Sequence, residues 1–309
     1  MTDSIMDETV KAIWRAHGLG AVRRIARVAS GISNACFIVN DDRVIRFNTF
    51  DMTVPKFENE RVAYDLLAGS GLPVPSVIVL DASRQVVPYD CIILTRLPGT
   101  NLAESWRDLT PAQIHDLVWE AGRCLARLHT MAFPAFGKLR EQDAPRFRSW
   151  LDYFNDYVHR YLSEAARYSL LNCALHTRLE ATLARSQSLL ARVARGVLVH
   201  SDYHYENILQ RAGRLTGILD FEWALSADPT YDFMSADVRE GQIPGSEAAF
   251  RGGYRSARSF DAEHEQRLAV YRLFLRLETA VMHTQRNNPP GAQSALAAMI
   301  HLLEIIEEE

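Results

Sequence analysis

Cysteine is scarce in this sequence and shows no pairing. The chain has 309 residues and four cysteines, and no two of them have the C-x-x-C spacing. The spacing therefore supports neither a disulfide framework nor a thiolate zinc site. We expect buried, reduced thiols at Cys36, Cys91, Cys124 and Cys173.

Long apolar runs and an excess of positive charge are also missing. No run of about 18 apolar residues occurs, and the N-terminal MTDSIMDETVKAIW lacks the basic start and apolar centre of a secretory signal. The formal net charge of −4 argues against a nucleic-acid backbone or an anionic membrane as the main partner. We therefore expect a cytoplasmic protein, long enough for two lobes that each have a core.

Glycine-rich phosphate loops are absent in their common forms. Neither G-x-G-x-x-G nor the Walker lysine motif occurs in the chain. The remaining candidate segment, RVASGISNACF, holds a single glycine, Gly31. Taken alone, this segment is a weak signal for nucleotide binding.

The first part of the chain reads as strands interrupted by one helix. Short runs rich in β-branched and aromatic residues, separated by turn signals, predict antiparallel strands at RRIARV, ACFIVN, RVIRFN, SVIVLD and DCIILTRL. Between the third and fourth runs, PKFENERVAYDLLAGSG carries a proline near its start and glycines at its end, which predicts a helix. We expect a five-stranded sheet with one packed helix within residues 1–95.

The rest of the chain is mostly α-helical by its apolar periodicity, so the fold class is α+β. Thr110, Pro111 and Gln113 form the pattern of a helix start with a capping box. Further helical patterns lie at about 146–168, 172–195, 261–285 and 293–307. One small β island interrupts them.

This β island brings three oxygen-bearing side chains together. In VLVHSDYHYENIL (197–209), a buried strand ends before His200 and Asp202, and Asn207 follows. The next segment, ILQRAGRLTGILDF, has the signature of a hairpin that ends at Asp220, so antiparallel pairing carries Asn207 and Asp220 to the same end. Amide and carboxylate oxygens suit Mg²⁺, and Asp202 can orient and deprotonate a hydroxyl group.

The spacing H-x-D-x-x-x-x-N followed by an aspartate is the catalytic-loop pattern of the protein-kinase fold. The motifs HSDYHYENIL, GILDFEWA and DPTYDF resemble those of the aminoglycoside phosphotransferase family, with Ser201 and Leu219 in place of the usual glycine and isoleucine. The segments LARLHTMAFPAFG and ILTRLPGTNL extend the resemblance over most of the chain. It implies a bilobal protein-kinase-like fold with a nucleotide-binding N-lobe (1–95), a hinge (96–100) and a helical C-lobe (101–309).

The resemblance also implies roles for single residues. Asp202 would be the catalytic base, and Asn207 and Asp220 would bind Mg²⁺ between the nucleotide phosphates. Three residues would organise the catalytic loop: His200, Asp228 and Asp232. We expect His204 to be exposed near the phosphates.

On the nucleotide side, the third strand carries an arginine where most kinases have a lysine. Arg46 would hold the phosphates and be oriented by Glu60, with Glu58 as the competing partner. Hygromycin phosphotransferases share this arginine, which favours that branch of the family.

The family further implies a short nucleotide loop and a hinge that reads the base. The loop residues near the phosphates would be Ser30, Gly31 and Asn34. The hinge would present the Thr95 carbonyl and the Leu97 amide to a purine edge. ATP is the expected nucleotide, with GTP left open.

On the acceptor side, residues 202–247 contain nine acidic residues against three arginines and no lysine. This surplus would attract a polycationic sugar, although a solvated acidic helix face explains it equally well. A second candidate feature of the acceptor side is an aromatic stripe on one face of the helix predicted at about 146–168. Such a stripe is more typical of a core than of a sugar-binding platform. Its residues are Trp150, Phe154, Tyr157 and Tyr161.

We therefore predict transfer of the γ-phosphoryl group of ATP to a hydroxyl of a small, cationic acceptor, with an aminoglycoside or aminocyclitol first. The alternative enzyme is a kinase of the same fold acting on choline, ethanolamine, homoserine or a macrolide. The alternative from another class is an inactive kinase-like nucleotide-binding module. A protein kinase is disfavoured because no Ala-Pro-Glu element follows Asp220, and the sequence predicts no oligomeric state.

Overall fold

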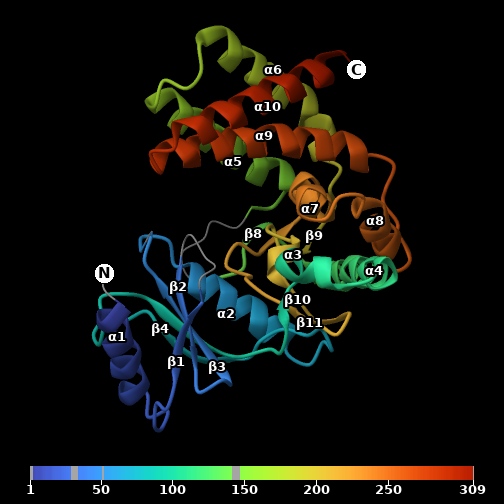
Figure 1. Cartoon of the computed structure of the whole chain (residues 1–309). Coiled ribbons are helices and arrows are strands. Elements are labelled where there is room, and N and C mark those ends of the chain that lie inside the picture. Colours follow the sequence, from blue (N-terminus) through green and yellow to red (C-terminus); the bar gives the residue numbers. More distant parts are fainter. Residues whose placement is uncertain (1–2, 29–33, 51, 141–146, 309) are drawn as a thin grey trace.

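The computed structural model describes residues 3–28, 34–50, 52–140 and 147–308. Figure 1 shows an N-lobe built on a twisted sheet and a larger, mostly helical C-lobe. This is the α+β, kinase-like arrangement that the sequence predicts. No helix of the described residues is long and apolar enough to cross a membrane.

The N-lobe sheet has five antiparallel strands in the order β1-β2-β3-β5-β4, as the sequence predicts. Its strands are β1 (Ile25–Val28), β2 (Asn34–Val39), β3 (Arg43–Asn48), β4 (Val77–Asp81) and β5 (Cys91–Thr95). The two N-lobe helices are α1 (Asp3–Ala16) and α2 (Lys56–Leu67). Alternate residues of β5 face different cores, because Ile92 packs in the cluster that includes α2 and Ile93 in the cluster under α1.

Within the described residues, the C-lobe contains the predicted helices and three further α-helices. The predicted helices are α4 (Pro111–Leu128), α5 (Trp150–Arg167), α6 (Cys173–Leu190), α9 (His264–Gln285) and α10 (Pro289–Glu308). The capping box is present, because the Gln113 amide donates to Thr110 Oγ1 at 3.3 Å and the Thr110 amide donates to Gln113 Oε1 at 2.9 Å. The helices that the sequence analysis missed are α7 (Ala236–Gln242) and α8 (Glu247–Arg255), and short α3 (Leu102–Ser105) precedes α4.

Two small sheets, rather than one β island, position residues 200–207, the predicted catalytic loop. The predicted hairpin is β10 (Ile208–Arg211) with β11 (Arg214–Ile218), and β6 (Thr100–Asn101) pairs with β10. Its two-residue turn has left-handed φ values at Ala212 (51°) and Gly213 (75°), which match the twist of a hairpin. The second sheet has the order β7-β9-β12-β8, with strands β7 (Ala132–Phe133), β8 (Gly137–Lys138), β9 (Gly196–Val199) and β12 (Leu225–Ala227).

The aromatic stripe of α5 is core, as predicted. Trp150 and Phe154 are fully buried, and Tyr157 is 5% exposed.

The expectation for the cysteines is only partly correct. Burial raises the pKa of Cys91 and of Cys124 to about 12, whereas Cys173 is exposed at the first turn of α6.

Two glycines explain why α8 was missed and how it packs. Gly252 and Gly253 weaken the helical signal of α8, but they allow its backbone to approach α4 closely. A Cβ atom on Gly253 would lie 1.9 Å from the Trp119 carbonyl oxygen, and one on Gly122 of α4 would lie 2.1 Å from the Phe250 oxygen. Figure 1 shows α4 and α8 side by side at the edge of the C-lobe.

This close packing predicts that Gly122→Ala destabilises the C-lobe by about 1–3 kcal/mol, because the added methyl group must push two backbones apart. Thermal or urea unfolding would measure the loss. Gly241→Ala in α7 is the matched control, because a Cβ atom there meets nothing within 4 Å. Equal stability of both variants would show that the α4–α8 contact tolerates expansion.

Candidate active site

One buried carboxylate, that of Asp232, fixes the backbone at the start of the predicted catalytic loop. Asp232 accepts hydrogen bonds from the backbone amides of His200 at 2.9 Å and of Ser201 at 2.6 Å. His200 Nε2 donates to the Leu219 carbonyl at 2.8 Å, and its Nδ1 accepts from the Asp202 amide at 3.3 Å. These bonds fix the turn that leads to Asp202.

The backbone conformation of Ser201 explains why glycine is usual at this position in the family. Its φ of 73° lies in the left-handed region, which favours glycine because other residues meet a Cβ penalty there. The serine keeps this conformation because its amide is bound to Asp232. The departure from the family pattern therefore leaves the path of the loop intact.

A buried histidine supports this arrangement and was given no role by the sequence analysis. His129 Nε2 lies 2.9 Å from Asp232 Oδ2, and its Nδ1 lies 2.8 Å from the Tyr254 hydroxyl. Both His129 and Asp232 are buried. The Leu-His element of LARLHTMAFPAFG was the available signal, because a histidine at the end of an apolar helix needs polar partners.

Asp228 differs from its expected role. Its carboxylate binds Arg267 at 2.6 Å, the Tyr271 hydroxyl at 2.6 Å and the Thr230 amide at 3.0 Å. It therefore ties the segment after β12 to α9 and makes no hydrogen bond to the catalytic loop among the described residues. Of the two aspartates, Asp232 is the one whose carboxylate binds backbone amides of the predicted catalytic loop.

The three oxygen-bearing residues of the predicted β island, Asp202, Asn207 and Asp220, converge as the hairpin geometry requires. Asn207 Nδ2 donates to the Asp202 carbonyl oxygen at 2.9 Å and to Asp202 Oδ2 at 3.2 Å. The Leu219 amide donates to the Asn207 carbonyl oxygen at 2.9 Å, so Asp220 follows directly beside Asn207. Asp202 and Asp220 keep 42% and 30% of their side chains exposed, which leaves the site open to small molecules.

Arg46 joins the N-lobe to this site. Its Nη1 lies 2.7 Å from Glu60 Oε1, and its Nη2 lies 3.0 Å from Asp220 Oδ1 and 3.0 Å from Glu222 Oε2. The partner on α2 is thus Glu60 and not Glu58. Burial tends to raise the pKa of Glu60, and the Arg46 guanidinium opposes that rise.

Glu222 is a site residue that the sequence analysis did not single out. Asn34 Nδ2 donates to Glu222 Oε2 at 2.9 Å, and the Lys56 ammonium lies 3.7 Å from Glu222 Oε1. The glutamate of GILDFEWA was the signal that could have identified it. Burial lowers the pKa of Lys56, although the charge of Glu222 opposes this effect.

The donor set fits a divalent cation such as Mg²⁺. One oxygen each from Glu60, Asp220 and Glu222 lie within 4.8 Å of one another. Asn207 donates through its amide nitrogen to Asp202, and within the described chain no hydrogen bond uses its Oδ1. Hard oxygen ligands with room for further ligands are what Mg²⁺ requires.

His204 is mostly buried, contrary to the expectation that it is exposed. Its Nε2 lies 3.1 Å from Asp202 Oδ1, and 13% of its side chain is exposed. Burial alone would raise the pKa of Asp202, but the hydrogen bond and charge of His204 lower it overall. Burial alone would lower the pKa of His204, and the bond to Asp202 raises it.

The hinge residues lie at the end of β5, beside the hairpin. The Thr95 amide donates to the Ser76 carbonyl at 2.9 Å, and the Leu97 side chain lies against Gly217 of β11. Ser30 and Gly31 lie outside the described residues. Nucleotide contacts of these four positions therefore stay predictions.

Residues of α7 support the catalytic loop from the other side. The buried Arg239 donates to the Tyr203 carbonyl at 2.9 Å, and Gln242 accepts from the Tyr205 amide at 2.9 Å. Tyr203 lies directly between Asp202 and His204 in sequence. The missed helix α7 thus contacts the loop on both sides of His204.

Much of the acidic surplus of residues 202–247 is neutralised internally. Asp237 pairs with Arg272 and Arg276, and Glu247 pairs with Arg239. Together with the pairs of Glu222 and Asp228 described above, these contacts leave fewer free carboxylates than the sequence count suggests. The prediction of an attraction for polycations is weakened accordingly.

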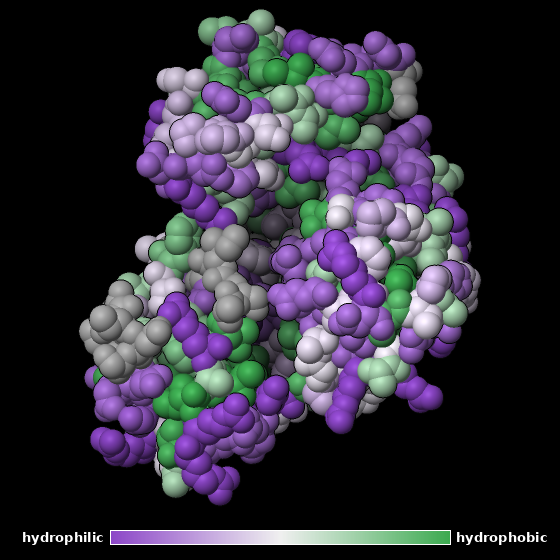
Figure 2. All heavy atoms as spheres, in the orientation of Figure 1, coloured by the Kyte–Doolittle hydropathy of each residue, from purple (hydrophilic) through white to green (hydrophobic). Residues whose placement is uncertain are grey.

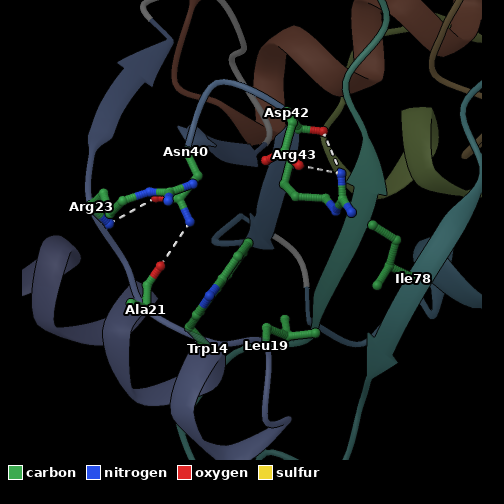
Figure 3. A pocket seen from close by; sticks show the side chains of 8 residues that line it. All are labelled: Trp14, Leu19, Ala21, Arg23, Asn40, Asp42, Arg43 and Ile78. Carbon is green, nitrogen blue, oxygen red and sulfur yellow. Dashed lines mark hydrogen bonds and ion pairs between the residues drawn. The ribbon is translucent and has the colours of Figure 1, made fainter.

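Figure 2 shows a hollow between the two lobes. The ion pairs of Arg46 with Asp220 and Glu222 place the site where the lobes meet. A separate cavity of about 310 Å³ lies on the N-lobe between α1 and the sheet, where Trp14 stands between Asn40 and Leu19 (Figure 3). None of the residues that line it belongs to the catalytic loop or to the Arg46 cluster. The cavity is therefore no part of the candidate active site.

Known proteins are similar to this chain in sequence and in fold. The chain is 26% identical over 298 residues to the homoserine kinase of Polaromonas naphthalenivorans (strain CJ2), covering 89% of this chain and 87% of the relative. It is 22% identical over 178 residues to the hygromycin-B 4-O-kinase of Escherichia coli, covering 57% and 50%. The structure of the gentamicin-APH(2")-IIa complex has the same fold, with a TM-score of 0.72, 16% identity and coverage of 97% and 96%.

The sequence profile of the phosphotransferase enzyme family matches residues 24–271. This match runs from the first strand of the N-lobe to α9. It includes every residue of the site described above. The chain therefore belongs to the phosphotransferase enzyme family.

Proposed function

We propose that this chain transfers the γ-phosphoryl group of ATP to a hydroxyl group of a small molecule. The observation that carries the proposal is the convergence of Asp202, Asn207 and Asp220 at one end of the hairpin, next to the Arg46–Glu60 ion pair. We assign nucleotide binding to residues 1–95, the hinge to 96–100, and the catalytic loop and acceptor site to 101–309.

Each group has a chemical task in this proposal. Asp202 accepts the proton of the acceptor hydroxyl, and its contact with Asn207 Nδ2 holds the carboxylate in place. Asn207 and Asp220 would hold Mg²⁺, with Glu222 as a further ligand. Held there, Mg²⁺ would neutralise negative charge on the nucleotide phosphates. Arg46 supplies a fixed positive charge toward the phosphates and is oriented by Glu60.

Two classes of acceptor have support. An aminoglycoside or aminocyclitol is favoured by the fold shared with the gentamicin complex and by the hygromycin-B kinase relative. An amino-acid alcohol is favoured by the homoserine kinase relative, because that match extends over 87% of the relative rather than 50%. The alternatives choline, ethanolamine and a macrolide have no comparable observation behind them.

A coupled ADP-release assay with purified protein tests the proposal. With MgATP we expect ADP release that depends on an added acceptor, in a panel of kanamycin, gentamicin, hygromycin B, L-homoserine, choline and ethanolamine. Omitting the acceptor or chelating Mg²⁺ is the control and should abolish the signal. Nucleotide binding without transfer to any acceptor would instead support the inactive kinase-like module.

A further inference from the structure

Lys138 lies at the end of the sheet where β9 leads into the predicted catalytic loop. Lys138 of β8 and Val199 of β9 both pair with Leu225 of β12, and both strands run antiparallel to β12. β8 and β9 are therefore parallel, and their last residues lie about 10 Å apart, two strand spacings. Asp202 follows Val199 by three residues, so Lys138 lies at the end of the sheet from which the segment with Asp202 leaves.

The Lys138 ammonium lies beside the candidate active site. It donates to the Trp223 carbonyl oxygen at 3.2 Å and lies 5.0 Å from the centre of the Trp223 ring. Trp223 is 38% exposed and follows Glu222, the residue bound to Arg46. In Figure 1, β8 lies between the N-lobe and the helices α5 and α9. The contact with Trp223 therefore places the Lys138 ammonium against the residue that follows Glu222 of the candidate active site.

Two arginines share this region, and within the described chain none of the three cations has a carboxylate partner. The charges of Arg140 and Arg160 act on Lys138, and no ion pair is formed by Lys138, Arg140 or Arg160. The Arg140 Nη1 atom is buried without a hydrogen-bond partner. Arg160 lies 5.0 Å from the Tyr161 ring instead of pairing with an acid.

One nearby carboxylate is already bound. Tyr157 and Tyr161 each donate their hydroxyl to Glu278, both at 2.6 Å. These two bonds use about half of the acceptor positions of a carboxylate. Glu278 can therefore receive one amine, but it does not cancel three positive charges. Burial lowers the pKa of Lys138 to about 8; the charge of Glu278 opposes this shift, and the charges of Arg160 and Arg140 add to it.

We infer that the acceptor is an alcohol that carries a carboxylate, which Lys138 binds with help from Arg140 and Arg160. This inference rests on the proposed function and names the acceptor class of the same site. A bound carboxylate supplies the missing negative charge, and the free positions of Glu278 suit an ammonium group on the same molecule. A polycationic aminoglycoside would bring like charges against this cluster, which is unfavourable.

Matched pairs of acceptors test this inference. L-Homoserine and L-homoserinol differ only in a carboxylate replaced by a hydroxymethyl group, and so do L-serine and serinol. With MgATP, kcat/KM should be at least about tenfold higher for the carboxylate member of the preferred pair, because hydrogen bonds to charged groups have effects of this size. A thermal shift with the carboxylate member, absent with its partner, gives a readout independent of turnover.

The variants separate recognition from folding. Lys138→Met should raise KM for the carboxylate acceptor by about tenfold or more and leave KM for its alcohol partner unchanged. Arg160→Gln, on an exposed side chain, should act in the same direction if Lys138→Met fails to fold. Arg167→Gln on the same helix is the matched control, since Arg167 is exposed and bound to Glu164. The Arg167 variant should leave KM unchanged for both acceptors.

The contrary outcomes are distinct. Turnover with aminoglycosides or choline and none with carboxylate alcohols would overturn this inference and leave the proposed function standing. An equal effect of Lys138→Met on both members of a pair would also overturn it. Absence of ADP release with every acceptor would contradict the proposed function itself, and this inference with it.

Discussion

Asp202→Asn is expected to lower kcat by about 10²–10⁴-fold, the usual contribution of a positioned general base. The amide that replaces the carboxylate cannot take the proton of the acceptor hydroxyl. ADP release with the preferred acceptor under saturating MgATP would measure the loss. Nucleotide affinity should change little, because the contacts of Arg46 with Glu60 do not involve Asp202.

The local geometry makes this substitution mild in structural terms. The asparagine can still accept from Asn207 Nδ2 through its carbonyl oxygen, and the backbone amide bond to His200 Nδ1 is untouched. Asp116→Asn is the matched control, because the Asp116 side chain is 81% exposed on α4, away from the site. Unchanged kcat in the Asp202 variant would remove Asp202 from the proposed role.

The sequence predicted the elements whose signals are local. The hairpin followed from its apolar runs and the Ala212–Gly213 turn, and antiparallel pairing then fixed the meeting of Asn207 and Asp220. The ion pair between Arg46 and Glu60 was instead predicted from the resemblance to the kinase fold, and the structure contains it. Strand signals and pairing rules are sufficient for the hairpin, whereas the contact between Arg46 and Glu60 needed the resemblance.

The sequence did not predict the contacts that arise only when distant segments pack together. Glu222 was counted among surplus acids, but the fold places it against Arg46 and Asn34. Helix α8 was missed because Gly252 and Gly253 weaken its pattern, while in the fold they allow contact with α4. A count of charges likewise cannot show which acids are already paired, as the case of Asp237 demonstrates.

The second large effect concerns Arg46, whose guanidinium is the shared counter-charge of three carboxylates. Removing one partner from a buried ion pair costs about 3–5 kcal/mol, because uncompensated charge stays buried. Arg46→Met should therefore lower the free energy of unfolding by about that amount in thermal or urea melts without Mg²⁺. Glu60, Asp220 and Glu222 would then face one another with oxygens within 4.8 Å.

The same argument makes the effect depend on the metal. A divalent cation binds the folded state of the variant more tightly, because it replaces the lost charge, and tighter binding to the folded state raises stability. Mg²⁺ should thus raise the melting temperature of Arg46→Met more than that of the unmodified protein. Arg61→Met is the matched control, since Arg61 forms an exposed pair with Asp65 on α2 whose loss costs about 0.3–0.5 kcal/mol. If Mg²⁺ stabilises both proteins equally, Asp220 and Glu222 do not hold the cation, and the proposed placement of Mg²⁺ fails.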